Sequence, residues 1–181
     1  MANKAALREL QARLAERLQQ ARSQERSQSW LAVEAGGHGL LLPLQEAGEI
    51  FPVGALMPVP HASAWFAGVA NLRGGLHGVV DLAAFLRGDA SAAPVGERVA
   101  EPGREQARLV ALNPALECNA ALLIDRLSGL RHLDRMTLEP PTEGSRPAFA
   151  GDCYRDETGS VWQELRLSAL AVDPAFLKIV D

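Results

Sequence analysis

The side chains that most often carry chemistry are few and scattered in this chain of 181 residues. Its four histidines are His38, His61, His77 and His132. None of them has the i, i+2 or i, i+4 spacing that places two imidazoles on one metal ion. The two cysteines, Cys118 and Cys153, are far apart and form no CxxC pair, so neither a zinc knuckle nor a disulfide framework is indicated. The sequence predicts no metal site and no cofactor.

Motifs of the common enzyme classes are also absent. There is no Gly-x-Ser-x-Gly elbow, no Walker loop, no dinucleotide fingerprint and no HExxH motif. Two carboxylates, Asp81 and Glu164, stand at the ends of expected strands, where a carboxylate can cap the helix that follows. We expect capping from both rather than acid–base catalysis, and therefore a protein that is not an enzyme.

Composition excludes further classes. A hydrophobic content of 48% is enough to bury a sizeable core. The net charge of -4 and the aromatic content of 5% argue against nucleic acid, which favours clustered basic residues and stacking platforms. No apolar run approaches the roughly 18 residues of a membrane span, and the N-terminus lacks the order of a signal peptide. We expect no membrane insertion and a cytoplasmic location.

Residues 1–27 form an extension with its own composition. Leucines recur there at spacings of three and four, with arginine and glutamate between them, which predicts an amphipathic helix. They are Leu7, Leu10, Leu14 and Leu18. The extension is cationic and the remaining chain is anionic, which favours docking of the helix on the body. Binding to a partner helix or to a membrane surface stay as alternatives.

Residues 28–88 consist of short apolar runs broken by glycine and proline, which is typical of a β-rich fold. Gly36-Gly37 predicts a reversal between two strands. A helical turn is expected over residues 44–50. Three prolines within residues 52–60 exclude a central strand and fit a crossover.

Two paired strands are predicted over residues 65–72 and 76–82. Their connection includes Gly74 and Gly75, which adopt positive φ at low cost and serve as backbone devices. Residues 81–86 then predict a short helix that closes this part of the chain.

The same layout restarts after a linker. Residues 89–106 are rich in glycine, proline, alanine and charge without any period, which predicts a linker or loop. Residues 107–172 then repeat the order of elements, with a helical turn expected over residues 126–130. Phe-Ala-Gly at 66–68 recurs at 149–151, and an acidic residue followed by leucine recurs at the same offset of 83.

These repeats predict a mainly β fold of two related halves. Residues 28–88 and 107–172 would each form a five-stranded SH3-like or OB-like barrel, and the two barrels would share a core. Burial between the halves would supply much of the stability, at about 25 cal/mol per Å². A short C-terminal helix is expected over residues 173–181, with Asp173 as its N-cap and Pro174 at its first position.

Residues 65–82, WFAGVANLRGGLHGVVDL, closely resemble the signature of the CheW-like domain family. The resemblance extends from residue 28 to about 172, since LLLPLQEAGEI and ALLIDRLSGL are similar to the corresponding segments of the family's two halves. It implies the two-barrel fold and a non-catalytic protein that couples chemoreceptors to a histidine kinase of the CheA type. The chain departs from the pattern at residues 152–165, which predict a longer and more polar hairpin.

The resemblance also implies a receptor-binding segment. Arg73, in the Asn-Leu-Arg-Gly motif, is expected to meet the receptor, with Glu49 as its ion-pair partner. Asn71 belongs to the same segment, where we expect it to organise the turn by bonding to the local backbone. That Arg73 is only a turn residue stays open.

The implied partners are the cytoplasmic tip of a methyl-accepting chemoreceptor and the regulatory domain of the kinase. A helical hairpin would lie in a groove between the barrels with Arg73 at its rim, and the protein would sit at membrane-associated receptor arrays. The motif and the extension are most similar to coupling proteins of systems that control type IV pili and twitching motility, with flagellar chemotaxis as the alternative. A sensory module that binds a ligand is a further interpretation, which a defined pocket would favour.

Overall fold

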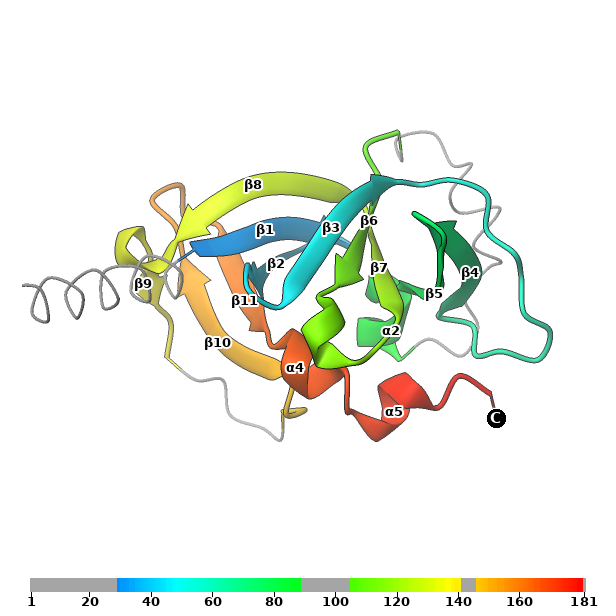
Figure 1. Ribbon diagram of the computed structural model, residues 1–181. Coiled ribbons are helices and arrows are strands. Elements are labelled where there is room, and N and C mark those ends of the chain that lie inside the picture. Colours follow the sequence, from blue (N-terminus) through cyan, green and yellow to red (C-terminus); the bar gives the residue numbers. More distant parts are fainter. Residues whose placement is uncertain (1–28, 89–104, 141–145, 181) are drawn as a thin grey trace, which may run out of the picture.

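The computed structural model describes residues 29–88, 105–140 and 146–180 (Figure 1). The predicted N-terminal helix over residues 1–27 and most of the predicted linker over residues 89–106 lie outside this part of the chain. The described residues form two mixed sheets and a few short helices, so the mainly β prediction is confirmed.

The first sheet has six strands in the order β8-β1-β2-β11-β10-β9. Its strands are β1 (Ser29–Ala35), β2 (His38–Pro43), β8 (Arg126–His132), β9 (Thr137–Leu138), β10 (Ala150–Arg155) and β11 (Val161–Leu165). All neighbours are antiparallel except β2 and β11, which run parallel.

The second sheet has five strands in the order β3-β6-β7-β5-β4. Its strands are β3 (Ala47–Pro52), β4 (Phe66–Leu72), β5 (Gly75–Asp81), β6 (Arg108–Leu112) and β7 (Ala120–Ile124). The only parallel neighbours among these strands are β5 and β7. The hairpin of β4 and β5 is the pair that residues 65–72 and 76–82 predicted.

Each sheet takes strands from both halves of the chain, which differs from the expectation that each half closes on itself. β1 and β2 share a sheet with β8–β11, and β6 and β7 share a sheet with β3–β5. The halves are joined by the parallel pairs β2/β11 and β5/β7 and by the antiparallel pairs β1/β8 and β3/β6. β7 is buried at all five positions, so it requires neighbours on both edges and cover on both faces. The exchange of strands supplies these neighbours.

Two predicted helical turns are wrong. Residues 44–46 form a tight turn and the chain then continues directly as β3, while residues 126–130 belong to the extended strand β8. In both places the backbone pairs with a strand from the other half: β3 with β6, and β8 with β1.

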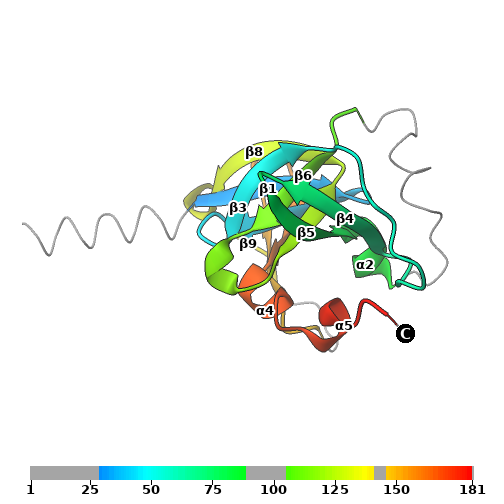
Figure 2. The same ribbon diagram turned by 45° about the vertical axis from the view of Figure 1, so that its right-hand side comes forward.

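The part of the chain that the structure describes also contains five short helical segments. They are α2 (Leu82–Arg87), η1 (Pro114–Leu116), η2 (Leu133–Arg135), α4 (Leu167–Leu170) and α5 (Pro174–Leu177). Figures 1 and 2 show α2, α4 and α5 on one side of the two sheets, opposite β3 and β8. The Asp173 carboxylate accepts hydrogen bonds from the Ala175 and Phe176 N–H groups, so the predicted cap of the last helix is confirmed.

The two carboxylates that we expected to cap helices behave differently. Asp81 is almost fully buried and accepts a 2.9 Å hydrogen bond from the Ala84 N–H at the start of α2. Glu164 does not cap α4, because Arg166 is the residue before that helix and the Glu164 carboxylate instead accepts from the Asp152 N–H at 3.1 Å. The prediction for Glu164 was therefore wrong.

The hydrogen bonds at the strand ends explain this error. The Asp81 N–H donates to the Trp65 carbonyl at 2.9 Å, and the Arg166 N–H donates to the Phe149 carbonyl at 2.8 Å. Trp65 therefore corresponds to Phe149, and Asp81 corresponds to Arg166. The structural repeat thus has a different offset from the repeat seen in the sequence. The offset is 83 in the repeated letters but 85 between Asp81 and Arg166, so Glu164 lies two residues before the cap position.

The main core lies between the two sheets and draws on both halves of the chain. Its fully buried members include Leu42, Val80, Leu122 and Leu165, from four different strands. A smaller apolar cluster fills each sheet's own interior, with Val79 and Leu109 in one and the two tryptophans Trp30 and Trp162 in the other. Burial of each such side chain contributes about 1.5–3 kcal/mol.

Candidate functional site

The hairpin of β4 and β5 ends in a tight turn that presents Arg73. Leu72 and Gly75 are paired, and the two residues between them, Arg73 and Gly74, have φ of +50° and +86°. Positive φ at both central positions defines a type I′ turn, which favours Asn-Gly. Gly75 lies in β5 and is not among the positive-φ residues, so the expectation that Gly74 and Gly75 both adopt positive φ is corrected.

An arginine at this position costs about 1 kcal/mol of backbone strain relative to glycine. The turn is held by Asn71, whose side-chain oxygen accepts a 2.8 Å hydrogen bond from the Gly74 N–H. The predicted role of Asn71 in organising the turn is confirmed. Arg73 is the strained member of the turn, and an observed strained residue on an exposed loop points to a use for its side chain.

Arg73 forms the predicted ion pair with Glu49. The Arg73 Nη2 and Glu49 Oε1 atoms are 2.6 Å apart, and the two side chains are 76% and 43% exposed. β3 and β4 are the two edges of the five-stranded sheet, so the pair joins these edges and helps close the sheet into a barrel. An exposed pair contributes at most about 1 kcal/mol. Its geometry leaves both charged groups accessible to a partner.

Behind the turn, the chain between β3 and β4 completes the closure. Met57 pairs with Val69 through two backbone hydrogen bonds of 2.8 Å each. Gly68, with φ of +125°, lies under this contact, and a Cβ atom there would collide with the Met57 carbonyl. Gly68 belongs to the motif of residues 65–82. The sequence did not indicate that Gly68 makes room for Met57, because the two residues are brought together only by tertiary pairing.

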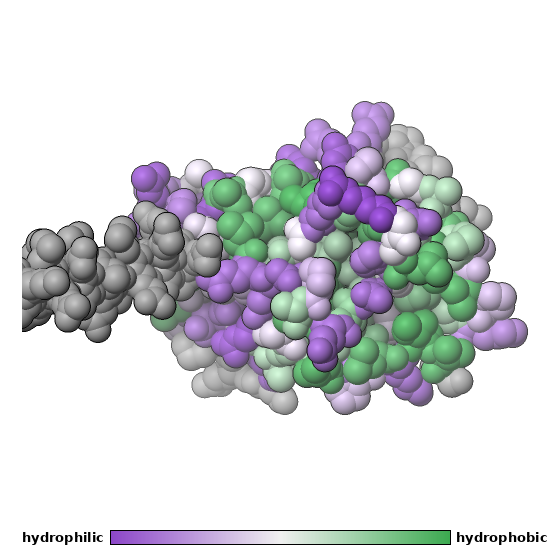
Figure 3. Space-filling view, viewed as in Figure 1, coloured by the Kyte–Doolittle hydropathy of each residue, from purple (hydrophilic) through white to green (hydrophobic). Residues whose placement is uncertain are grey.

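A second exposed feature lies on β8. Leu127 and Leu130 are 38% and 55% exposed, and we call these two residues the β8 strip. Leu127 pairs with Val33 and Leu130 pairs with Leu31, and both partners are buried in the core between the sheets. The β8 strip therefore lies on the same face of the sheet as the core, at its solvent-exposed edge. Figure 3 shows hydrophobic surface along the upper side, where β8 lies.

The β8 strip lies on the same side of the molecule as β3, which carries Glu49 (Figures 1 and 2). Sequence reasoning missed it, because residues 126–130 were expected to form a helical turn. At the start of β8, Arg126 bonds to the Glu34 carboxylate at 2.6 Å and lowers the pKa of Glu34. In the sequence, leucines at 127 and 130 on either side of Gly129 could have indicated an irregular edge strand. In the structure Gly129 has φ of +90°.

The structure places a cavity elsewhere. It has a volume of about 830 Å³ and lies next to Trp65, which precedes β4, whereas Arg73 follows β4. Neither Arg73 nor Glu49 lines it. The predicted groove with Arg73 at its rim is therefore not this cavity.

The hairpin of β10 and β11 has a longer and more polar loop than the hairpin of β4 and β5, as predicted. Its loop is organised by Asp156, which accepts hydrogen bonds from the Thr158 and Ser160 N–H groups and from the Trp162 indole at 2.9 Å each. Hydrogen bonds, first from the Thr158 side chain and then from Trp162 and the loop backbone, lower the pKa of Asp156 to about 2.

Within residues 29–88, 105–140 and 146–180, no three His, Cys, Asp or Glu side chains gather as they would around a metal ion. Cys118 and Cys153 are half-buried thiols, and burial raises the pKa of Cys118. No helix among these residues is long and apolar enough to cross a membrane.

Comparison with known proteins identifies the family to which the chain belongs. A family model for the CheW-like domain matches residues 29–175. The chain belongs to the CheW-like domain family. Protein PilI of Pseudomonas aeruginosa is 30% identical to it over 162 residues, which cover 86% of this chain and 83% of PilI.

A solved structure supports the same fold. The scaffolding protein CheW of Thermoanaerobacter tengcongensis matches with a TM-score of 0.59 and 15% identity, over 78% of this chain and 85% of that one. The mixed two-sheet architecture of this chain is therefore that of the CheW-like fold.

Proposed function

We propose that this protein couples a chemoreceptor to a CheA-type histidine kinase, without catalysis of its own, and that Arg73, Glu49 and the β8 strip form the receptor contact. The carrying observation is Arg73 itself. It occupies a strained type I′ position, its guanidinium is exposed, and Glu49 orients it at 2.6 Å. Such a residue adds little to stability and much to recognition of a charged partner.

The receptor surface that fits is a helical hairpin with an apolar stripe and an acidic group beside it. The β8 strip offers leucine side chains to the stripe, and Arg73 would bind the acidic group while fixing the register. Asn71 supports the contact indirectly, since it shapes the turn that carries Arg73.

The similarity to PilI supports a pathway that controls type IV pili and twitching motility, rather than flagella. In this proposal the protein sits in the cytoplasm at membrane-associated receptor arrays, where the kinase's regulatory domain binds a surface other than the Arg73 turn. Restoration of twitching in Pseudomonas aeruginosa that lacks PilI tests the pathway. Failure there with retained binding to receptor and kinase would limit the proposal to coupling.

The receptor contact is tested by pull-down with a purified receptor hairpin and the regulatory domain of a CheA-type kinase. Arg73→Asn suits the type I′ turn and removes the guanidinium. Arg155→Asn is the matched control, because Arg155 forms a similar 2.7 Å exposed pair with Glu139 in the other sheet. We expect Arg73→Asn to lose the receptor and keep the kinase, while the control keeps the receptor. Equal receptor binding by both variants would refute the assignment.

A further inference from the structure

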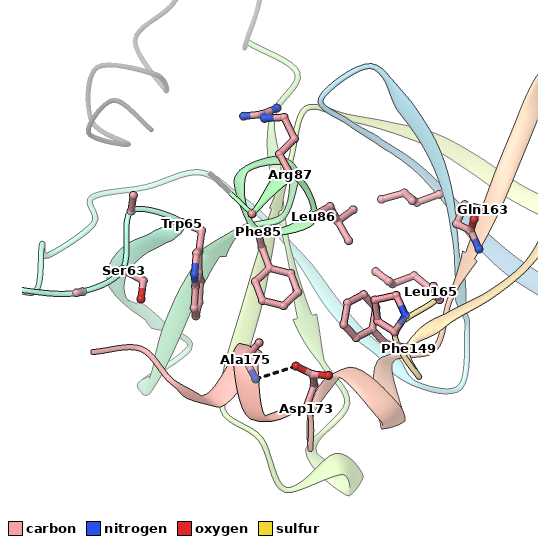
Figure 4. A pocket seen from close by; sticks show the side chains of 16 residues that line it. Ser63, Trp65, Phe85, Leu86, Arg87, Phe149, Gln163, Leu165, Asp173 and Ala175 are labelled. Atoms are coloured by element: carbon pink, nitrogen blue, oxygen red, sulfur yellow. Dashed lines mark hydrogen bonds between the residues drawn. The ribbon is translucent and has the colours of Figure 1, made fainter. Parts of the chain in front are cut away.

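The cavity of about 830 Å³ opens between the two sheets beside α2 and α5 (Figure 4). Six separate parts of the chain line it: β2, the segment before β4, the end of α2, the start of β10 with the residues before it, β11, and the start of α5. The principal wall residues are Trp65, Phe85, Phe149, Leu165, Gln163 and Ala175. Its volume falls within the roughly 300–1,000 Å³ of small-molecule sites.

The aromatic walls are fixed by contacts with one another. Phe85 packs against Trp65, Phe149 and Phe176 with ring centroids 5.2, 5.8 and 5.4 Å apart. Trp65 also stacks on Phe176 at 6.3 Å. Edge-to-face packing of this kind holds the rings in one arrangement, so the apolar wall exists before any ligand arrives.

Most polar groups along the cavity are already engaged by the protein. The Gln163 amide donates to the Gly151 carbonyl at 2.7 Å and accepts from the Cys153 thiol at 3.0 Å. The Asp173 carboxylate caps α5, and the Ser63 hydroxyl lies 3.4 Å from the Lys178 carbonyl. These side chains therefore have little hydrogen-bonding capacity left for a ligand.

One end of the cavity is different. Figure 4 shows the Arg87 side chain at the end beyond Trp65 and Phe85, away from Phe149 and Leu165. A guanidinium has five N–H donors, so Arg87 can bind an anionic group in addition to contacts within the protein. The cavity therefore has an apolar wall, which includes Phe85, and a positively charged side chain at one end.

We propose that this cavity binds a free amphiphile with a single flexible apolar chain and a carboxylate, of the medium-chain fatty acid class. The chain lies against Trp65, Phe85 and Phe149, and the carboxylate meets Arg87. A flexible chain can follow the lining around Phe85, which a rigid ring system of the same volume cannot. The inference is independent of the receptor contact, because it uses none of the residues of that surface.

Calorimetric titration of the full chain with decanoate, below its micelle concentration, tests the proposal. We expect saturable binding of one molecule per chain. Ala175→Trp adds bulk at an exposed position that lines the cavity and should abolish binding, whereas Ala115→Trp, at an exposed position that does not line it, should bind as the wild type does. Absence of saturable binding, or equal binding by both variants, overturns the proposal.

The charged end is tested with Arg87→Gln. Loss of one charge-assisted contact should weaken decanoate binding about tenfold. Binding of decan-1-ol, which has no charge, should be unchanged. Equal weakening of both ligands would overturn the role of Arg87. Methyl NMR shifts of Leu40 and Leu165 on decanoate addition to the wild type provide a readout that needs no variant, and unshifted signals would place any binding elsewhere.

Discussion

The Arg73 guanidinium and the Glu49 carboxylate, 2.6 Å apart, join the two edge strands of the five-stranded sheet. The pair lies on the surface, beside a turn in which Arg73 has φ of +50°. The energetic cost of the turn and the small gain from an exposed pair nearly cancel. Stability therefore gives no reason for arginine at this position, and recognition does.

Arg73→Asn is expected to leave the free energy of unfolding within about 1 kcal/mol of the wild type, because relief of strain offsets loss of the ion pair. Urea unfolding followed by tryptophan fluorescence measures this. A loss above about 2 kcal/mol would show that the pair is a structural element of barrel closure. The binding result for the same variant would then need reinterpretation.

Gly68→Ala is expected to destabilise the protein by about 3 kcal/mol, since it combines positive φ with a collision against the Met57 carbonyl. Gly74→Ala is the matched control. Gly74 also has positive φ, but a Cβ atom there meets open space, so the expected cost is about 1 kcal/mol. Similar costs for the two variants in urea unfolding would argue against the Met57 contact as the closure of the barrel.

Asp81→Ala should cost about 1–2 kcal/mol through loss of the α2 cap. Asp81→Asn keeps an oxygen that can accept from the Ala84 N–H and should recover most of this loss. Glu164→Gln is the comparison, because Glu164 caps no helix and its replacement should change stability little. Thermal unfolding of the three variants distinguishes these cases, and a larger loss for Glu164→Gln would contradict the structural repeat.

Acid should loosen the hairpin of β10 and β11. The folded-state pKa of Asp156 is about 2, below its ordinary value of 3.8, so the charged form favours the folded loop. This contribution is fully present above the ordinary pKa and is lost as the pH falls from about 4 to about 2. The fluorescence of Trp162, whose indole bonds to Asp156, should follow the change, and Asp156→Asn should remove the pH dependence.

Leu130→Ser should weaken receptor binding about tenfold while it leaves the folded protein nearly as stable as the wild type, because the side chain is 55% exposed. Val172→Ser changes an even more exposed apolar residue, at 70%, on the side of the helices. We expect Val172→Ser to bind the receptor normally. Equal losses in a hairpin binding assay would remove the β8 strip from the proposed contact.

Local features were predictable from short stretches of sequence. The hairpin of β4 and β5, the turn held by Asn71, the Asp81 cap and the Asp173 cap each depend on residues a few positions apart. Their hydrogen bonds join residues that are close in the sequence, so residue type and spacing are sufficient to predict these features.

Other features depended on which strands pair in the folded protein. The motif around Asn71 and Arg73 determined the family and the turn by sequence alone. Only the tertiary structure decided that strands exchange between the halves, that Glu164 lies two residues before the N-cap of α4, that Met57 covers Gly68, and that a cavity lies beside Trp65. The reason is physical: apolar strands carry no local mark of their partner, and pairing is selected by the burial that the whole fold achieves.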